Sequence, residues 1–319
     1  MFLFSADRVP GPRREGSRYT AENRGLASVS STRTMPTETM PAIVVGQRFG
    51  PYRIEGLLGA GGMGKVYLAQ DCALGRTVAI KVVDHSRHDP DALHLLVREA
   101  RLAASLNHPS ICSVHEVGRL GDEPFIVMEH IRGEALSTLI HRRPALPFDT
   151  ALQYEIQIAD AVAHAHDHEI VHGDIKSSNI MVEPGGQVKI LDFGLAVQRS
   201  VPAASDASAI DTTTPPPPSS CTGTVPYMAP ELLRGRPADV HSDIWALGVV
   251  FFEMLAGYRP FRGATAYELA AAILANEPVS LPSWVPLAVR LVVDRCLVTC
   301  PVERYPSVRD LTSELADLL

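Results

Sequence analysis

The sequence lacks a hydrophobic stretch long enough to cross a membrane. Its longest apolar run, residues 244–258, is interrupted by Glu253, whereas a membrane-spanning helix needs about 20 apolar residues. The apolar start, Met-Phe-Leu-Phe, is too short for the core of a secretory signal. We therefore expect neither a membrane span nor a signal peptide, and we interpret residues 244–258 as a buried helix.

The sequence also has no excess of positive charge and no closely paired cysteines. Its formal net charge of −7 argues against a chain built to coat nucleic acid or an anionic membrane. The cysteines, at positions 72, 112, 221, 296 and 300, form no Cys-x-x-Cys pair. This usage fits a reducing, cytoplasmic compartment. Cys296 and Cys300 lie one helical turn apart, but no further ligand has zinc-site spacing.

Two polar segments differ from the rest of the chain. Residues 1–46 are rich in Arg, Ser, Thr, Pro and Glu without a sustained period, which predicts a disordered tail. Residues 200–220 include four consecutive prolines, which favour an exposed, extended loop within the folded region.

Hydrophobic periodicity divides the remainder into two parts. The pattern over residues 50–130 is typical of strands, apart from one helix at about 90–106. Helical periods dominate from residue 133 onward and end in the amphipathic segment 307–319, after which we expect no sensor domain. The sequence therefore predicts an α+β fold with a β-rich part followed by a larger, mainly helical part.

A glycine-rich segment, L-G-A-G-G-M-G-K-V, lies at residues 58–66. Dinucleotide-binding folds share its Gly-x-Gly-x-x-Gly spacing, but there the third glycine begins a helix. Here the residues that follow alternate as in a strand, so we predict a strand–turn–strand loop whose backbone N–H groups approach phosphate oxygens. On this motif alone, a plain glycine-rich hairpin is an equal alternative. The candidate nucleotide-binding residues are Leu58, Gly59, Ala60, Gly61, Gly62, Met63 and Gly64.

A lysine ends the β-branched segment V-A-I-K at residues 78–81. A charge inside such a strand costs free energy unless it is paired. Glu99, on the apolar face of the predicted helix, is the expected partner of Lys81. The pair would hold the ammonium group on the α- and β-phosphates of a nucleotide, whereas the alternative is a surface lysine on an edge strand.

The segment V-H-G-D-I-K-S-S-N, residues 171–179, carries the residues for phosphoryl transfer. The carboxylate of Asp174 can orient a hydroxyl nucleophile and accept its proton. The amide oxygen of Asn179 suits magnesium, whose other ligands would come from phosphates. Lys176 can offset the growing charge on the transferred group. Asp192, which begins D-F-G after the buried segment 188–191, is the second predicted magnesium ligand.

In this order the motifs resemble a bacterial serine/threonine protein kinase of the eukaryotic-like, or Hanks, type. The resemblance covers about residues 49–319. It rests on G-A-G-G-M-G-K-V, V-A-I-K, Glu99, H-G-D-I-K-S-S-N, D-F-G, M-A-P-E at 228–231, S-D-I-W at 242–245 and Arg304 in P-V-E-R-Y-P-S.

The resemblance implies a two-lobed kinase domain at residues 47–319. Its β-rich N-lobe with one key helix would cover about 49–130, and its mainly helical C-lobe about 131–319. It implies ATP and magnesium, with manganese as an alternative metal, and transfer of the γ-phosphate to Ser or Thr of protein substrates in signalling.

The resemblance also implies roles for further residues. Met128 would be the gatekeeper, and Glu129 to Ile131 the hinge that holds adenine. Val66, Ala79 and Met181 would pack on the purine. Glu231 and Arg304 would form a buried ion pair that braces the activation segment. Asp243 would anchor the catalytic loop, and Thr224 would contact Asp174 and Lys176.

Gly173 stands where protein kinases usually have Arg and small-molecule phosphotransferases often have Gly. Met-Ala-Pro-Glu and Lys176 favour a protein acceptor over a small molecule. Residues 171–179, the catalytic loop, are therefore of the non-RD type, in which no Arg precedes the Asp. Since Gly cannot neutralise a phosphate, we hypothesise that phosphorylation of the activation loop is not an obligatory on-switch. Thr222 and Thr212–Thr214 are candidate autophosphorylation sites.

The main alternative to a catalytic kinase is a pseudokinase, a binding module without catalysis. A pseudokinase scaffold would be expected to lack a required charge or ligand, yet all five such positions are filled, namely Lys81, Glu99, Asp174, Asn179 and Asp192.

His164 and His168 have the spacing of a zinc pair but no third ligand. We interpret them, with His166, as surface or packing residues of a helix, and His172 as packing on Phe193.

Overall fold

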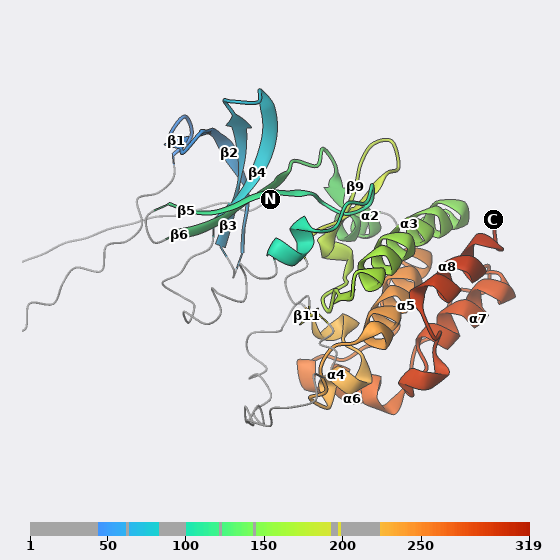
Figure 1. Ribbon diagram of the computed structural model, residues 1–319. Helices are drawn as coiled ribbons and strands as arrows, with labels where there is room; N and C mark the ends of the chain where they lie inside the picture. Colours follow the sequence, from blue (N-terminus) through green and yellow to red (C-terminus); the bar gives the residue numbers. More distant parts are fainter. Residues whose placement is uncertain are drawn as a thin grey trace, which may run out of the picture. The chain divides into compact units, whose positions relative to one another are not determined.

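The computed structural model describes residues 44–61, 64–82, 100–120, 123–142, 145–192, 197–198 and 224–319. Strands dominate the first part of the chain and helices the second (Figure 1). Residues 1–43 of the predicted tail lie outside the described residues. The predicted loop at 200–220 also lies outside them. Of the predicted helix at 90–106, the described residues 100–104 are helical.

Six strands form one antiparallel sheet in the order β1-β2-β3-β4-β6-β5. They are β1 (Arg48–Phe49), β2 (Tyr52–Gly61), β3 (Gly64–Asp71), β4 (Arg76–Val82), β5 (Val114–Leu120) and β6 (Glu123–Glu129). The turn between β3 and β4 is set by Asp71, whose Oδ1 accepts hydrogen bonds from the N–H groups of Ala73 and Leu74. Gly75, at φ +67°, completes the turn in a conformation that favours glycine.

Two smaller sheets hold the ends of residues 172–179. Strands β10 (Val188–Ile190), β9 (Ile180–Val182) and β7 (Glu134–Ala135) form one sheet in this order. Strands β8 (Ile170–Val171) and β11 (Val197–Gln198) form the other. The segment lies between β8 and β9 and includes a short 3-10 helix at Ser177–Asn179, so its two ends are fixed by different sheets.

Helices make up most of the second part of the fold. They are α2 (Leu136–Arg142), α3 (Phe148–Asp167), α4 (Pro230–Leu233), α5 (Val240–Ala256), α6 (Ala266–Ala275), α7 (Leu287–Cys296) and α8 (Val308–Ala316). Asp239 caps the N-terminus of α5 by accepting from the N–H groups of His241 and Ser242, and Gly257 ends the helix at φ +77°.

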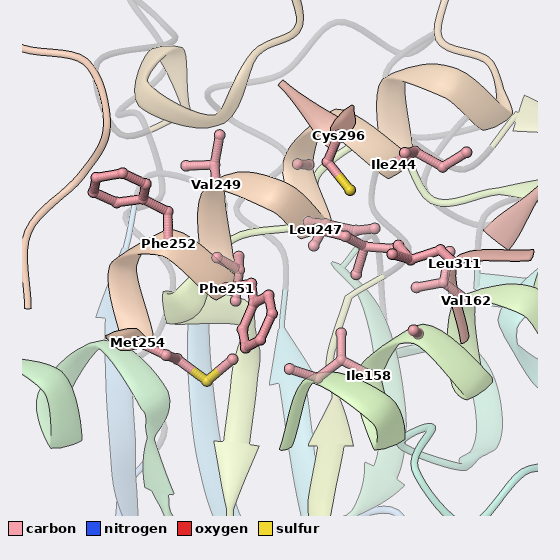
Figure 2. Close-up of a cluster of buried hydrophobic side chains, with 14 of the residues drawn as sticks. Ile158, Val162, Ile244, Leu247, Val249, Phe251, Phe252, Met254, Cys296 and Leu311 are labelled. Carbon is pink, nitrogen blue, oxygen red and sulfur yellow. The ribbon is translucent and has the colours of Figure 1, made fainter. Parts of the chain in front are cut away.

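The prediction of a buried helix at 244–258 is confirmed, although the helix ends at Ala256. All α5 residues from Ser242 onward are buried. Figure 2 shows their side chains meeting Ile158 and Val162 of α3, Cys296 of α7 and Leu311 of α8. Burying each large apolar side chain contributes about 1.5–3 kcal/mol. Among the described helices, none is both long and apolar enough to span a bilayer.

Candidate active site

The side chain of Lys81 lies in the middle of the six-stranded sheet and is buried. Its Nζ donates a hydrogen bond to Oδ2 of Asp192 over 2.9 Å. The ion pair joins β4 to the segment after β10 and compensates the buried ammonium group. Glu99, the partner expected from the sequence, lies outside the described residues.

The register of the sheet places the predicted purine-contacting side chains beside Lys81. Val66 lies opposite Lys81, and Ala79 lies opposite Met128. Directly paired residues in antiparallel strands point to the same face, and so do residues two apart in one strand. Val66, Ala79, Lys81 and Met128 therefore share one face of the sheet.

The described residues of the glycine-rich segment belong to β2 and β3, which pair in antiparallel fashion. The ladder pairs Gly59 with Val66 and reaches Gly61 opposite Gly64. A strand, not a helix, follows the third glycine, as the sequence predicted. Leu58 and Ala60 belong to β2 and are exposed, whereas Gly62 and Met63 lie outside the described residues. This arrangement differs from a dinucleotide-binding fold and suits a loop that covers phosphates.

The predicted hinge begins at the end of β6 and is tied to the helical part by Glu129. Its Oε2 accepts hydrogen bonds from Nζ of Lys189 over 2.9 Å and from the N–H group of Ser113 over 3.3 Å. Ile131 is buried, and Met181 lies in β9, opposite Lys189. The Lys189–Glu129 pair was not predicted from the sequence.

Asp174 is the centre of a network of polar contacts. Its Oδ2 accepts from Nζ of Lys176 over 2.7 Å and from Nδ2 of Asn179 over 3.0 Å. The same lysine donates to Oγ1 of Thr224 over 3.2 Å. Oδ1 of Asp174 is buried and has no partner among the described residues. This oxygen is therefore available to accept a hydrogen bond from a hydroxyl acceptor.

Thr224 only partly fulfils its predicted contacts. The structure brings it to Lys176 but shows no hydrogen bond between Thr224 and Asp174 in the part of the chain that it describes. The lysine thus lies between the two, bonded to the carboxylate and to the hydroxyl. An ammonium group has three donors, so one hydrogen bond remains for a third group such as a phosphate oxygen.

Asp243 of α5 holds the start of the catalytic loop through backbone hydrogen bonds. Oδ2 accepts from the N–H of His172 and Oδ1 from the N–H of Gly173, both over 2.9 Å. Oδ2 also lies 2.8 Å from Nε2 of His166. The interpretation of His166 as a mere packing residue was therefore incomplete, because its ring contacts the buried carboxylate that anchors the loop.

His172 connects the backbone on the two sides of the site. Its Nδ1 accepts from the N–H of Asp174 over 3.1 Å, so Nε2 carries the proton and donates to the carbonyl of Leu191 over 3.3 Å. Burial lowers the pKa of His172, which favours this neutral form. The ring thereby links Leu191, which directly precedes Asp192, to Asp174. Phe193, its predicted packing partner, lies outside the described residues.

The site contains oxygen ligands that fit a magnesium ion with nucleotide phosphates. Nδ2 of Asn179 is used in bonds to Asp174, which leaves its Oδ1 without a partner among the described residues. Oδ2 of Asp192 is paired with Lys81, and the carboxylate is 41% exposed. Amide and carboxylate oxygens are what a hard cation prefers, and magnesium characteristically takes further ligands from phosphates.

The pair of Glu231 and Arg304 lies away from the reacting groups. Nη1 and Nη2 of Arg304 donate to the two carboxylate oxygens over 2.7 and 2.9 Å, in bidentate geometry. Both side chains are almost fully buried. Since Glu231 belongs to α4, the pair fixes this short helix to the buried core of the helical part.

The rings of His108, His164 and His168 lie close together. The ring centroids of His108 and His164 are 5.2 Å apart, and those of His164 and His168 are 4.5 Å apart. Both nitrogens of His108 are used, by Asp160 and by the N–H of Ser110. Within the described ranges, no group of three or more His, Cys, Asp or Glu side chains is placed to hold a metal ion.

Comparisons with known proteins agree with this geometry. Residues 52–314 match the family model described as the protein kinase domain. The chain belongs to the protein kinase family, and its β-rich N-lobe and helical C-lobe form the two-lobed kinase fold.

Its relatives include bacterial serine/threonine-protein kinases. The chain is 37% identical over 279 residues to PrkC of Bacillus subtilis, an alignment that covers 86% of this chain and 41% of the relative. It is 38% identical over 264 residues to PknA of Mycobacterium tuberculosis, covering 81% and 59%. It is 34% identical over 274 residues to PknB of Mycobacterium leprae, covering 83% and 42%. The chain thus spans roughly half the length of the curated relatives that it matches.

Proposed function

We propose that the chain is an ATP-dependent serine/threonine protein kinase that also phosphorylates itself. The observation that carries the proposal is the placement of Lys81, Asp192, Asp174 and Lys176. One ion pair joins the two parts of the fold, and a second cation lies on the carboxylate that would receive the acceptor hydroxyl. A scaffold without catalysis would have no need to keep both.

The residues have distinct roles in transfer. Lys81 would hold the α- and β-phosphates, and Asp192 and Asn179 would hold magnesium. The metal, when bound, neutralises phosphate charge and aligns the nucleotide. Oδ1 of Asp174 orients the acceptor hydroxyl and takes its proton as the new P–O bond forms. Lys176 offsets the negative charge on the transferred group.

Thr224 supports a Ser or Thr acceptor, because the resemblance associates a threonine bonded to this lysine with that specificity. The residues of the adenine pocket would be Val66, Ala79, Met128, Glu129, Ile131 and Met181. Glu99 would complete the pairing of Lys81.

Four described cysteines are free thiols, which is consistent with the proposed reducing, cytoplasmic location.

Gly173 has a backbone conformation that favours glycine, with φ at +73°. Because glycine stands here in place of the usual arginine, the loop also lacks the cation that would bind a phosphate on the activation loop. We therefore keep the hypothesis that this phosphorylation is not an obligatory on-switch. Thr222, the candidate autophosphorylation site, lies outside the described residues. If Thr222→Ala removed nearly all activity toward an added substrate, the hypothesis would be wrong.

The test is transfer of label from ATP in the presence of magnesium, with and without a generic basic acceptor protein. Labelled Ser or Thr should appear with the wild type, and Asp192→Ala should give none. Nucleotide binding without any transfer would indicate the pseudokinase alternative. Transfer to a small-molecule hydroxyl but to no protein would contradict the proposed acceptor.

A further inference from the structure

A pocket of about 710 Å³ lies beside α2, the C-terminal end of α5 and the loop that leads to α6. Its apolar wall includes Ile140, Phe261 and Leu269. Pockets of this size can accept part of a peptide or a small ligand. None of the roles proposed for the active-site residues uses this pocket.

The charged groups of the pocket leave one arginine without a counter-charge. Glu253 is the acidic residue of the lining, and its Oε1 accepts from Nε of Arg259 over 3.3 Å. Arg262 also lines the pocket, is exposed and forms no ion pair within the described residues. Its guanidinium lies 5.0 Å from the centroid of the Tyr258 ring, which supports the group without neutralising it.

Two further titratable side chains, Glu268 and His141, lie close to the pocket. Glu268 at the start of α6 is turned to the backbone, where its Oε2 accepts from the N–H of Ala264 over 2.7 Å. His141 also belongs to the lining and adds a positive charge whenever it is protonated. The chain as a whole carries a net charge of −7. A local positive group on such a molecule offers an acidic partner one favourable place to bind.

Buried hydrogen bonds connect the pocket to the catalytic loop. The hydroxyl of Tyr227 donates to Oε2 of Glu253 over 2.7 Å. Because the Tyr227 hydroxyl proton is used in that bond, Ser177 is the donor in the 2.8 Å hydrogen bond between the hydroxyls of Ser177 and Tyr227. Ser177 follows Lys176 directly in the chain. The pocket wall is thus hydrogen-bonded to the loop where the acceptor hydroxyl would react.

We propose that this pocket binds an acidic segment of the protein substrate and that Arg262 determines this preference. A guanidinium binds a carboxylate through two parallel N–H groups, and the apolar wall accommodates a side chain next to the acid. A basic segment would meet Arg259 and Arg262 in a lining whose one carboxylate, that of Glu253, is already paired with Arg259, and this repulsion disfavours it. The inference rests on the proposed kinase function for the identity of the segment as substrate.

The first experiment measures binding alone. A labelled peptide carries one alanine flanked on both sides by glutamates, and its counterpart has glutamines at the same positions. Fluorescence anisotropy at fixed ionic strength gives the Kd of each peptide. We expect the glutamate peptide to bind about fivefold more tightly or better, and Arg262→Glu to abolish the difference. Arg262→Gln should reduce it by an intermediate amount.

The matched control is Arg48→Glu, which makes the same charge change at an exposed residue of β1. This variant should keep the preference for the glutamate peptide. Equal Kd values for both peptides in the wild type would overturn the inference. So would an equal loss of preference in Arg48→Glu and Arg262→Glu, because the attraction would then be a property of net charge and not of the pocket.

The second experiment separates the pocket from catalysis. The same peptides with threonine in place of alanine compete for transfer, and the ratio of their kcat/KM values is measured. A ratio well above one that falls in Arg262→Glu supports the inference. Phosphorylation of both peptides at equal kcat/KM would leave the kinase function intact and overturn the inference. Selective binding without transfer to either peptide would support the pocket and contradict the proposed function.

Discussion

Replacing Arg304 by lysine tests how strongly the buried ion pair stabilises the fold. The side chain of Arg304 is 0% exposed. Nε donates to the carbonyl of Val298, Nη1 to Glu231 and to the carbonyl of His241, and Nη2 to Glu231 and to the carbonyl of Thr299. A guanidinium has five N–H groups, so all its donors are used.

A lysine keeps the positive charge but loses this geometry. Its three donors project from one atom and cannot reach the carboxylate and three separate carbonyls of a site shaped for a planar fork. Each buried acceptor left unpaired costs about 1–3 kcal/mol, and breaking a buried pair costs about 3–5 kcal/mol. We expect Arg304→Lys to lower the free energy of unfolding by about 3–5 kcal/mol, a large share of the ~5–15 kcal/mol of an ordinary domain.

Urea unfolding at neutral pH, followed by circular dichroism, measures this change. The midpoint should fall while the slope stays constant, since the surface exposed on unfolding is unchanged. The matched control is Arg309→Lys, because Arg309 is 63% exposed in its pair with Asp167; its effect should be much smaller. A loss below about 1 kcal/mol in Arg304→Lys would refute the reasoning, since a buried, fully bonded guanidinium cannot be replaced so cheaply.

Three further changes test the candidate site. Lys81→Met should lower single-turnover transfer by about a hundredfold or more without unfolding the protein, because the cation that pairs with Asp192 is lost; near-normal rates would contradict the assignment. Thr224→Val should lower kcat more than it changes the KM for ATP, since it removes the hydroxyl that orients Lys176; a change in KM alone would count against this role. The unfolding free energy should fall as the pH drops below about 6.5, since burial lowers the pKa of His172 and only the unfolded histidine then gains a proton. This fall should be shallower in His172→Gln, and identical slopes would exclude His172 as a source.

Features that depend on local spacing were predictable from the sequence. The alternation after Gly64 predicted a strand, and the structure has β3 there. The long apolar run that only Glu253 interrupts predicted a buried helix, and it forms most of α5. The first follows from the 2.0-residue period of a strand and the second from the length of the apolar run, and neither needs knowledge of the rest of the fold.

Contacts between distant segments were not predictable in the same way. Lys189 and Glu129 are 60 residues apart in the chain, and His166 and Asp243 are 77 apart. A helical period places His166 on a face of α3, but it does not state which side chain that face will meet. Glu253 carried a usable signal, because a carboxylate inside a buried helix requires a partner. That signal predicts a donor nearby, although it cannot name Tyr227 or Arg259.

Gly173 shows how the structure adds a second cause to a sequence observation. The absence of arginine at this position removes a cation. The structure shows in addition that one carboxylate, that of Asp243, accepts from the successive N–H groups of His172 and Gly173. The residue at 173 lies at φ +73°, where a side chain costs about 1–2 kcal/mol and glycine avoids this strain. Any arginine introduced at 173 therefore changes charge and strain together. Gly173→Ala, which adds the strain without the charge, is the variant against which its effect on activity has to be compared.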